Sequence, residues 1–299
     1  MDFYVSRGEP FASVLRRLEA QGLIYDHRIV SLWARLWSLD RKIHWGHYRF
    51  ELPMAPRQIV NQMVPGIGAF RRVTVPEGLT LAEVADLMEN SGLGKKEKLL
   101  KEAENPELLS QAGIAGKKLE GYLFPTTYYF TPVTTEREIL LAMVEQFQQS
   151  FTPAMREQAK ELGLSIHEVV TLASMIEKET ALPAERLLVS AVFHNRLKRR
   201  IALQSDPTVI YGLRRFSGNL TRRDLQQRTP YNTYLVPGLP PGPICNPGLA
   251  ALEAALAPPA VPYLYFVSKN DGTHLFSATI SEHNRAVNRY QKEKRSPRL

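Results

Sequence analysis

The sequence predicts an α+β fold in which two similar N-terminal β-α-α-β units precede a larger mixed α/β domain around one cleft. Three observations predict it: an internal repeat in the first third, a capped amphipathic helix after Ser165, and a strand hairpin near the C-terminus. We expect the first unit over residues 1–74, the second over 75–118 and the larger domain over 119–299.

The internal repeat aligns residues 5–23 with residues 75–93 at a constant offset of 70, without a gap. Each copy has a β-rich start, a turn at a glycine, and an amphipathic helix that ends at a second glycine. After the first copy, residues 24–39 have the pattern of a second helix, and residues 43–52 alternate like a strand. The identical pairs are Val5/Val75, Gly8/Gly78, Ala12/Ala82, Val14/Val84, Glu19/Glu89, Gly22/Gly92 and Leu23/Leu93.

Composition narrows the class of protein. The 299 residues include 38 Lys and Arg against 30 Asp and Glu, so the net charge is +8, which favours nucleic acid, a membrane surface or an acidic polymer as partner. The single cysteine, Cys245, excludes an internal disulfide framework and a cysteine-rich zinc site. We recognise no signal peptide or membrane span, because the longest uncharged run, 229–252, holds six prolines.

Several kinds of site lack their signatures. The seven histidines show no metal-ligand spacing, and neither a phosphate loop nor a Gly-x-Ser-x-Gly elbow occurs. We therefore expect no metal and no cofactor. Nucleic-acid binding rests on charge alone, since no zinc-finger, RNP-like or basic-zipper pattern is present, and we expect no nucleic-acid partner.

The helix predicted after Ser165 contains the candidate catalytic group. Ser165 and Glu168 form a capping box, and an apolar stripe follows. At roughly 100° per residue, Glu177 falls between Val170 and Ala173 inside the apolar arc. Burial raises the pKa of a carboxyl group, and a carboxylic acid that stays protonated near neutral pH is what glycosidic cleavage needs as general acid.

Two alternatives to this interpretation remain open. Glu179 lies at the opposite edge of the apolar stripe and is a rival for the acid. Glu177 could instead form a buried salt bridge with an arginine such as Arg186 or Arg196.

Polar clusters downstream supply candidate substrate ligands. Gln204, Asp206 and Thr208 lie on a predicted loop, and Asn232 and Tyr234 precede a proline-rich loop that reaches Asn246. The aromatic segment 120–130, which begins at Glu120, suits either a core strand or a wall of a carbohydrate cleft. Residues 262–268 are predicted as a strand, with a hairpin turn at Asp271-Gly272.

Residues 173–180 (ASMIEKET) resemble the MltG (YceG-like) family of endolytic murein transglycosylases. The resemblance continues in chain order over nearly the whole sequence: 120–125, 194–197, 203–212, 231–234, 238–248, 262–267 and 274–276. It implies cleavage of the MurNAc–GlcNAc β-1,4 bond within nascent glycan strands, which leaves 1,6-anhydro-MurNAc ends and terminates elongation.

The same resemblance implies roles for individual residues. Glu177 is then the catalytic glutamate, with Glu179 in a supporting role, and Asp206 matches the family's Gln-x-Asp-Pro-Thr stretch. Gln204, Thr208, Asn232, Tyr234, Asn246 and Glu120 are the further candidates for substrate binding. The implied partners are peptidoglycan glycan strands and cell-wall synthases.

The N-terminal repeat is similar to LysM, a small glycan-binding module, in its Val-x-x-Gly opening, although such units could equally serve only to pack or position the rest. The family also implies a membrane-anchored protein at the extracytoplasmic (periplasmic) face of the inner membrane. Because this chain starts almost at the first repeat strand, we expect it to lack the transmembrane anchor. Two other functions remain open: a non-enzymatic glycan-binding scaffold for synthases, and a hydrolytic muramidase that uses Asp206 to activate water.

Overall fold

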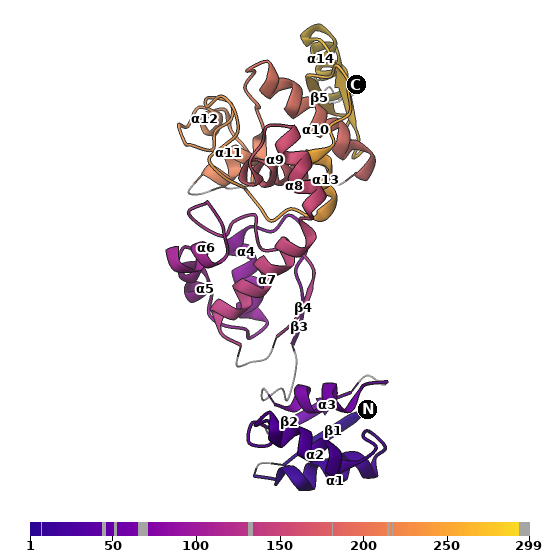
Figure 1. Cartoon of the computed structure of the whole chain (residues 1–299). Coiled ribbons are helices and arrows are strands. Elements are labelled where there is room, and N and C mark those ends of the chain that lie inside the picture. Colours follow the sequence, from indigo (N-terminus) through magenta and orange to yellow (C-terminus); the bar gives the residue numbers. More distant parts are fainter. Residues whose placement is uncertain are drawn as a thin grey trace, which may run out of the picture. The chain divides into compact units, whose positions relative to one another are not determined.

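The computed structural model describes a mixed helical and stranded protein (Figure 1), with three two-stranded antiparallel sheets among the described residues. The chain divides into two compact units. The first comprises Met1–Thr74, Met88–Lys95 and Thr127–Ile139, and the second comprises Val75–Leu87, Lys96–Thr126 and Leu140–Leu299. The described residues are 1–6, 8–43, 46–50, 53–64, 71–130, 134–180, 182–213, 216 and 218–292.

The N-terminal segment has the predicted β-α-α-β order. Strand β1 (Asp2–Val5) pairs antiparallel with β2 (Gly46–Arg49), and helices α1 (Phe11–Ala20) and α2 (His27–Leu36) lie between them in sequence, followed by α3 (Pro56–Met63). Within the strand predicted over 43–52, residues 44, 45, 51 and 52 lie outside the described residues. The likeness of this segment to LysM stays a prediction.

The second repeat copy differs from the expected order. Strand β3 (Arg71–Thr74) pairs with β4 (Thr127–Phe130), and three helices separate them in sequence: α4 (Leu81–Asn90), α5 (Lys96–Glu102) and α6 (Pro106–Gln111). The order is therefore β-α-α-α-β instead of β-α-α-β, because Asn105 caps a further helix at Pro106. The closing strand β4 lies in the aromatic segment 120–130, within the range predicted for the larger domain; the division at residues 74 and 118 stays a prediction.

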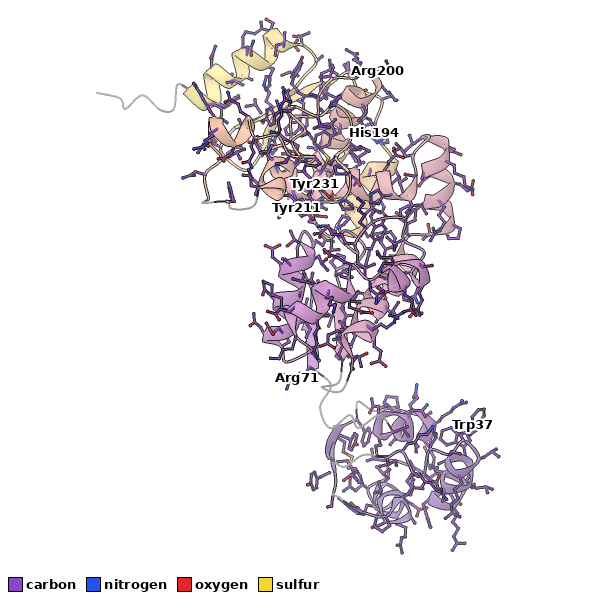
Figure 2. The ribbon with its side chains drawn as sticks, turned by 90° about the vertical axis from the view of Figure 1, so that its left-hand side faces the viewer. Trp37, Arg71, His194, Arg200, Tyr211 and Tyr231 are labelled. Carbon is purple, nitrogen blue, oxygen red and sulfur yellow. The ribbon has the colours of Figure 1, made fainter. Side chains whose placement is uncertain are left out.

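Helix α9 is the centre of the second unit. It runs over Ile166–Glu179, packs against α13 and α10, and begins with the predicted capping box. Tyr211 and Tyr231 pack nearby within this unit, with ring centroids 4.8 Å apart (Figure 2). The helices that accompany α9 are α7 (Glu136–Ser150), α8 (Pro153–Glu161), α10 (Pro183–Lys198), α11 (Asp206–Gly212), α12 (Arg222–Leu225), α13 (Leu249–Leu256) and α14 (Ile280–Val287), with a π-helical turn at Asn288–Lys292.

The predicted C-terminal hairpin is present. Strand β5 (Tyr265–Ser268) pairs antiparallel with β6 (His274–Ser277), and Gly272 in the connecting turn has φ of +87°. That backbone conformation is readily available to glycine and rare for other residues, so the Asp-Gly pair predicted the turn for a physical reason.

The long uncharged run is a loop for most of its length. Residues 229–248 are irregular, and helix α13 begins at Leu249. Its prolines remove backbone donors, so a helix cannot form there. Searching the described residues for a bilayer-crossing helix finds none that is sufficiently long and apolar.

Candidate functional site

Glu177 lies in the last turn of helix α9, at the edge of the hydrophobic core. Ser165 Oγ accepts the backbone N–H of Glu168, and the residues from Val169 to Ile176 are all buried. Glu177 follows this buried stretch in the last turn of the helix, and its side chain is only 7% exposed. The apolar periodicity of the sequence therefore predicted correctly that this carboxyl group is largely removed from water.

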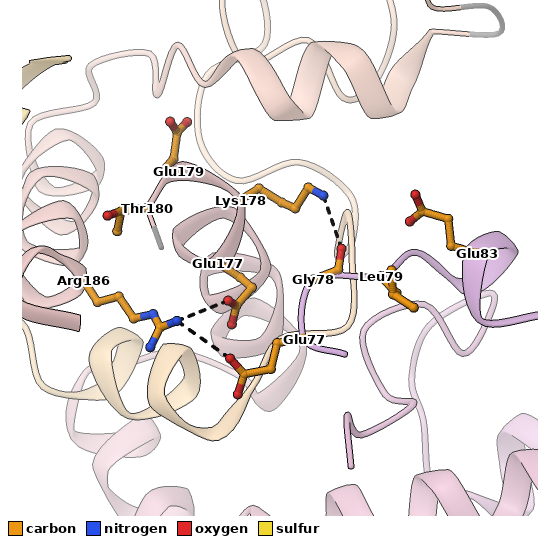
Figure 3. Close-up of a pocket in the computed structure, with 9 residues that line it drawn as sticks. All are labelled: Glu77, Gly78, Leu79, Glu83, Glu177, Lys178, Glu179, Thr180 and Arg186. Atoms are coloured by element: carbon orange, nitrogen blue, oxygen red, sulfur yellow. Dashed lines mark hydrogen bonds and ion pairs between the residues drawn. The ribbon is translucent and has the colours of Figure 1, made fainter. Parts of the chain in front are cut away.

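The carboxylate of Glu177 has two close partners. Its Oε2 accepts the backbone N–H of Gly248 at 3.0 Å, and its Oε1 lies 3.4 Å from Nη2 of Arg186 (Figure 3). The same Nη2 lies 3.7 Å from Oε2 of Glu77. The salt bridge foreseen as an alternative to catalysis is therefore present with Arg186, whereas Arg196 donates elsewhere, for example to the backbone oxygen of Leu264 at 2.6 Å.

Burial is the main influence on the acidity of Glu177. It raises the pKa of the carboxyl group above its ordinary value, and the negative charge of Glu77 adds to that rise. The Gly248 N–H, Arg186 and Lys178 act in the opposite direction, without reversing it. The group can thus remain protonated to higher pH than an exposed glutamate, and it has nearby donors to stabilise the carboxylate once the proton has left.

A pocket of about 490 Å³ opens beside Glu177 (Figure 3). Its size lies within the range that is usual for small-molecule sites. Charged side chains of both signs line it. The lining residues are Glu77, Gly78, Leu79, Glu83, Glu177, Lys178, Glu179, Thr180 and Arg186.

One wall of the pocket is the turn at residues 77–79, which sequence reasoning did not assign to the site. Gly78 has φ of +78°, its N–H donates to the Asn246 carbonyl oxygen at 2.9 Å, and its own carbonyl accepts Lys178 Nζ at 3.2 Å. The repeat alignment matched Gly78 with Gly8, which has the same φ, and so indicated a turn. No local pattern indicated that this turn lies against Glu177.

Glu179 lines the same pocket, but its carboxyl group is turned away from the Glu177–Arg186 pair (Figure 3). Oε1 accepts the hydroxyl of Ser205 at 2.5 Å, immediately before helix α11. Burial raises the pKa of Glu179 to about 7, and the charge of Asp206 contributes to the rise. Glu179 therefore links helix α9 to the segment that carries the predicted substrate ligands.

Three predicted ligands lie together here, but the expectation of a loop was wrong for Asp206 and Thr208, which lie in helix α11 (Asp206–Gly212), since Pro207 suits the first turn of a helix. Asp206 is exposed at the start of α11, and its Oδ1 accepts the Tyr234 hydroxyl at 2.7 Å. Gln204 is also exposed, with φ of +54°, and its Oε1 accepts Arg196 Nη1 at 3.1 Å. The charges of both Asp206 and Glu179 raise the pKa of Tyr234, after the larger effect of burial, so these groups interact electrostatically.

Asn246 is fully buried and all its side-chain groups are engaged. Its Oδ1 accepts the backbone N–H groups of Gly121 and Leu123 at 3.0 and 2.9 Å, and its Nδ2 donates to the Leu79 carbonyl at 2.9 Å. The residue thereby ties the 77–79 turn to the distant segment 121–123. Direct contact with substrate stays a prediction, but the observed bonds hold the wall of the pocket.

Glu120 is 3% exposed and likewise bonds to protein groups. Its Oε1 accepts the backbone N–H of Leu81 and its Oε2 accepts the Tyr211 hydroxyl, each at 2.8 Å, with Lys118 Nζ 3.9 Å away. Burial raises its pKa, although these partners oppose the rise. Glu120 therefore joins the start of α4 to α11.

Thr208 and Asn232 are the remaining predicted ligands, and both are buried. The hydroxyl of Thr208 lies 2.8 Å from that of Thr233. Asn232 Nδ2 donates to the carbonyl oxygens of Leu225 and Gln227 at 3.0 and 2.8 Å. These bonds shape the loop around Tyr234, and substrate contact by either residue stays a prediction.

Among the described residues, one group of possible metal ligands lies close together: Glu19, Asp26 and His27. Glu19 and His27 form an ion pair of 2.6 Å, and Asp26 caps helix α2 by accepting the backbone N–H groups of Arg28 and Ile29. The capping and the ion pair already account for this cluster, which lies in the other unit from Glu177.

Comparison with known proteins adds the following. Residues 3–289 match the model of the YceG-like family. The chain is 34% identical over 261 residues to an endolytic murein transglycosylase of Bacillus subtilis, covering 82% of this chain and 72% of that one. It is 28% identical over 320 residues to one of Streptococcus pneumoniae, covering 95% of this chain but only 58% of the relative. A crystal structure of a yceG-like protein from Listeria monocytogenes superposes with a TM-score of 0.67 at 32% identity, over 95% of this chain and 98% of the other.

Proposed function

Because the chain belongs to the YceG-like family, we propose that it is an endolytic murein transglycosylase with Glu177 as its catalytic residue. It would cut the MurNAc–GlcNAc β-1,4 bond of nascent peptidoglycan strands, leave 1,6-anhydro-MurNAc ends and so terminate elongation. The observation that carries the proposal is the largely buried Glu177 carboxyl group, with its raised pKa, beside a polar pocket.

The proposed reaction needs one acid that later acts as a base. Protonated Glu177 donates its proton to the glycosidic oxygen as the bond to C1 breaks, and the GlcNAc side leaves as an alcohol. The Glu177 carboxylate then takes the proton of the C6 hydroxyl, whose oxygen bonds to C1 of the same MurNAc. The carboxylate regains its proton and no water is consumed, unlike in the usual two-carboxylate glycosidases.

Arg186 and the Gly248 N–H support this cycle. Between the two proton transfers Glu177 is negatively charged, and both groups are within reach of its oxygens. Nε of Arg186 is buried without a hydrogen-bond partner among the described residues, so the guanidinium also has a donor to offer. We propose that Arg186 stabilises the carboxylate without holding Glu177 permanently ionised.

The residues predicted to bind substrate fall into an exposed or part-exposed group and a buried group. Asp206, Gln204 and Tyr234 are the ones we propose as direct contacts for the glycan, because they are exposed or part-exposed and close to Glu179. The buried candidates act by holding the loops that shape the pocket. They are Glu120, Thr208, Asn232 and Asn246.

The wider setting follows from the family. We propose an extracytoplasmic protein that is membrane-anchored in its full-length form and works with cell-wall synthases. The N-terminal β-α-α-β unit is a LysM-like module in this proposal, the segment 75–118 links it to the catalytic domain, and residues 119–299 carry the chemistry. The chain spans 58% of the length of its streptococcal relatives.

A digest of purified glycan strands, with products resolved by mass, tests the activity. Anhydro ends support the proposal, reducing ends point to a hydrolytic muramidase, and intact strands point to a binding scaffold. Glu177→Gln is expected to lower the rate by roughly a hundredfold to ten-thousandfold, the usual contribution of a general acid. Glu161→Gln, on the exposed end of α8, is the matched control; a Glu177→Gln variant as fast as this control would refute the assignment.

A further inference from the structure

Helix α2 exposes an unusual row of large apolar side chains. Ile29, Leu32 and Leu36 are 68%, 74% and 80% exposed. Tyr25 before the helix and Trp37 at its C-cap are exposed at 97% and 59%, and Trp37 lies at the edge of the N-terminal part (Figure 2). We call these five residues the α2 surface. Contiguous exposed apolar groups of this kind mark an interaction site more often than scattered ones do.

The α2 surface is a separate face, not a loosely packed part of the core. Val30 and Ala34 of the same helix are buried against the N-terminal core. At roughly 100° per residue, Ile29, Leu32 and Leu36 share an arc of about 60° on the side of the helix away from those two residues. The helix therefore packs on the N-terminal core through Val30 and Ala34, without using Ile29, Leu32 or Leu36.

Positive charge flanks the apolar row. Arg28 and Arg35 are exposed along one side of it, at about 40–60° from Leu32 on the helix, and Arg41 and Lys42 are exposed just beyond it. Two carboxylates near the start of the helix are already engaged, since Asp26 caps α2 and Glu19 pairs with His27. Within the described residues no ion pair joins Arg28 or Arg35 to a carboxylate.

We propose that the α2 surface docks on an anionic lipid surface. Aliphatic side chains would enter the boundary between headgroups and acyl chains, while Tyr25 and Trp37 would take the interfacial level that such rings favour. Arg28 and Arg35 would contact phosphate groups, as basic residues on the polar side of interfacial helices do. The inference is independent of the proposed activity, because it uses no residue of the pocket.

A lipid surface suits these residues better than a second copy of the chain. In a twofold pair the same face would meet itself and bring the flanking arginines together, and like charges at close range oppose association. An anionic membrane satisfies the apolar row and the arginines at once.

Co-sedimentation of the full chain with vesicles tests the inference. We expect binding to vesicles containing phosphatidylglycerol, much weaker binding to pure phosphatidylcholine, and weakening by salt. The triple variant Ile29→Ser, Leu32→Ser, Leu36→Ser should bind at least about tenfold more weakly, since each change removes apolar burial. The control is Leu235→Ser with Ile280→Ser, which alters side chains of 48% and 53% exposure in the other unit.

Circular dichroism should show all variants folded, because the changed side chains are exposed. A second measurement is the quenching of tryptophan fluorescence by brominated lipid. We expect quenching in the wild-type chain and its loss in the Trp37→Phe variant. The inference fails if the chain binds neither vesicle, if both lipids bind it equally, or if the triple variant binds like the control. It also fails if sedimentation equilibrium shows a dimer that the triple variant abolishes.

Discussion

Arg186 Nη2 lies 3.4 Å from Oε1 of Glu177 while it also lies 3.7 Å from Oε2 of Glu77. One guanidinium is therefore shared between a largely buried carboxylate and a second that is 48% exposed. This sharing matters because the two neighbours push the pKa of Glu177 in opposite directions, Glu77 upwards and Arg186 downwards. A salt bridge and a carboxyl group with a raised pKa are thus compatible at this position.

Replacing Glu77 should make Glu177 more acidic. In Glu77→Gln the like charge that raises the pKa of Glu177 is gone, and Arg186 is left to one carboxylate. The proposed reaction requires protonated Glu177, so we expect the rate of the variant to decline at lower pH than the rate of the wild type. A pH profile of kcat for anhydro-product release measures this, and an unchanged alkaline limb would contradict it.

Replacing Arg186 should shift the alkaline limb of the pH profile of kcat in the opposite direction, to higher pH. Arg186→Gln removes a cation that lowers the pKa of Glu177, so the acid should stay protonated to higher pH. We also expect kcat to fall by about tenfold or more, because the carboxylate formed during the reaction loses its charged partner. Arg285→Gln, an exposed position on α14, serves as control. If the alkaline limb of the kcat profile moves to lower pH in Arg186→Gln, Arg186 does not lower the pKa of Glu177 and the prediction is wrong.

Removing the Asn246 side chain should destabilise the second unit. Asn246→Ala leaves the buried N–H groups of Gly121 and Leu123 without their acceptor and removes one of the two donors to the Leu79 carbonyl, which keeps the backbone N–H of residue 246. A loss of roughly 2–4 kcal/mol in the free energy of unfolding is expected from several buried hydrogen bonds. Urea denaturation checks it against Asn219→Ala, an exposed position. Equal urea midpoints for the two variants would show that the Asn246 side chain does not stabilise the fold.

Glu179 should make stability depend on pH. Its pKa is raised from 4.5 to about 7 in the folded chain, so its favourable contribution is complete below pH 4.5 and is lost as pH rises through 7. Glu179→Gln removes that dependence. Relative to the variant, the wild type should therefore lose on the order of 2–3 kcal/mol between pH 4.5 and 8. Denaturation of both proteins across this range measures it, and parallel curves would refute it.

Local patterns in the sequence were enough to predict helix α9 with its capping box, the buried position of Glu177 and the Asp-Gly hairpin. Each depends on neighbours within a few residues, since helical periodicity, capping and turn chemistry are short-range effects. The extra helix α6 was not predicted, because the repeat alignment ended before it. A strand within 120–130 was one of two open alternatives, but its pairing with β3 was not predicted.

By itself, then, the sequence determined that the Glu177 carboxyl group is largely withdrawn from water, and it placed helix α9 and the C-terminal hairpin. The tertiary structure alone decided the surroundings of that carboxyl group. Gly248 reaches Glu177 across 71 positions, and Lys178 holds the Gly78 carbonyl across 100. Contacts over such separations depend on how whole elements pack, so no local pattern could reveal that the 77–79 turn and Gly248 lie against Glu177.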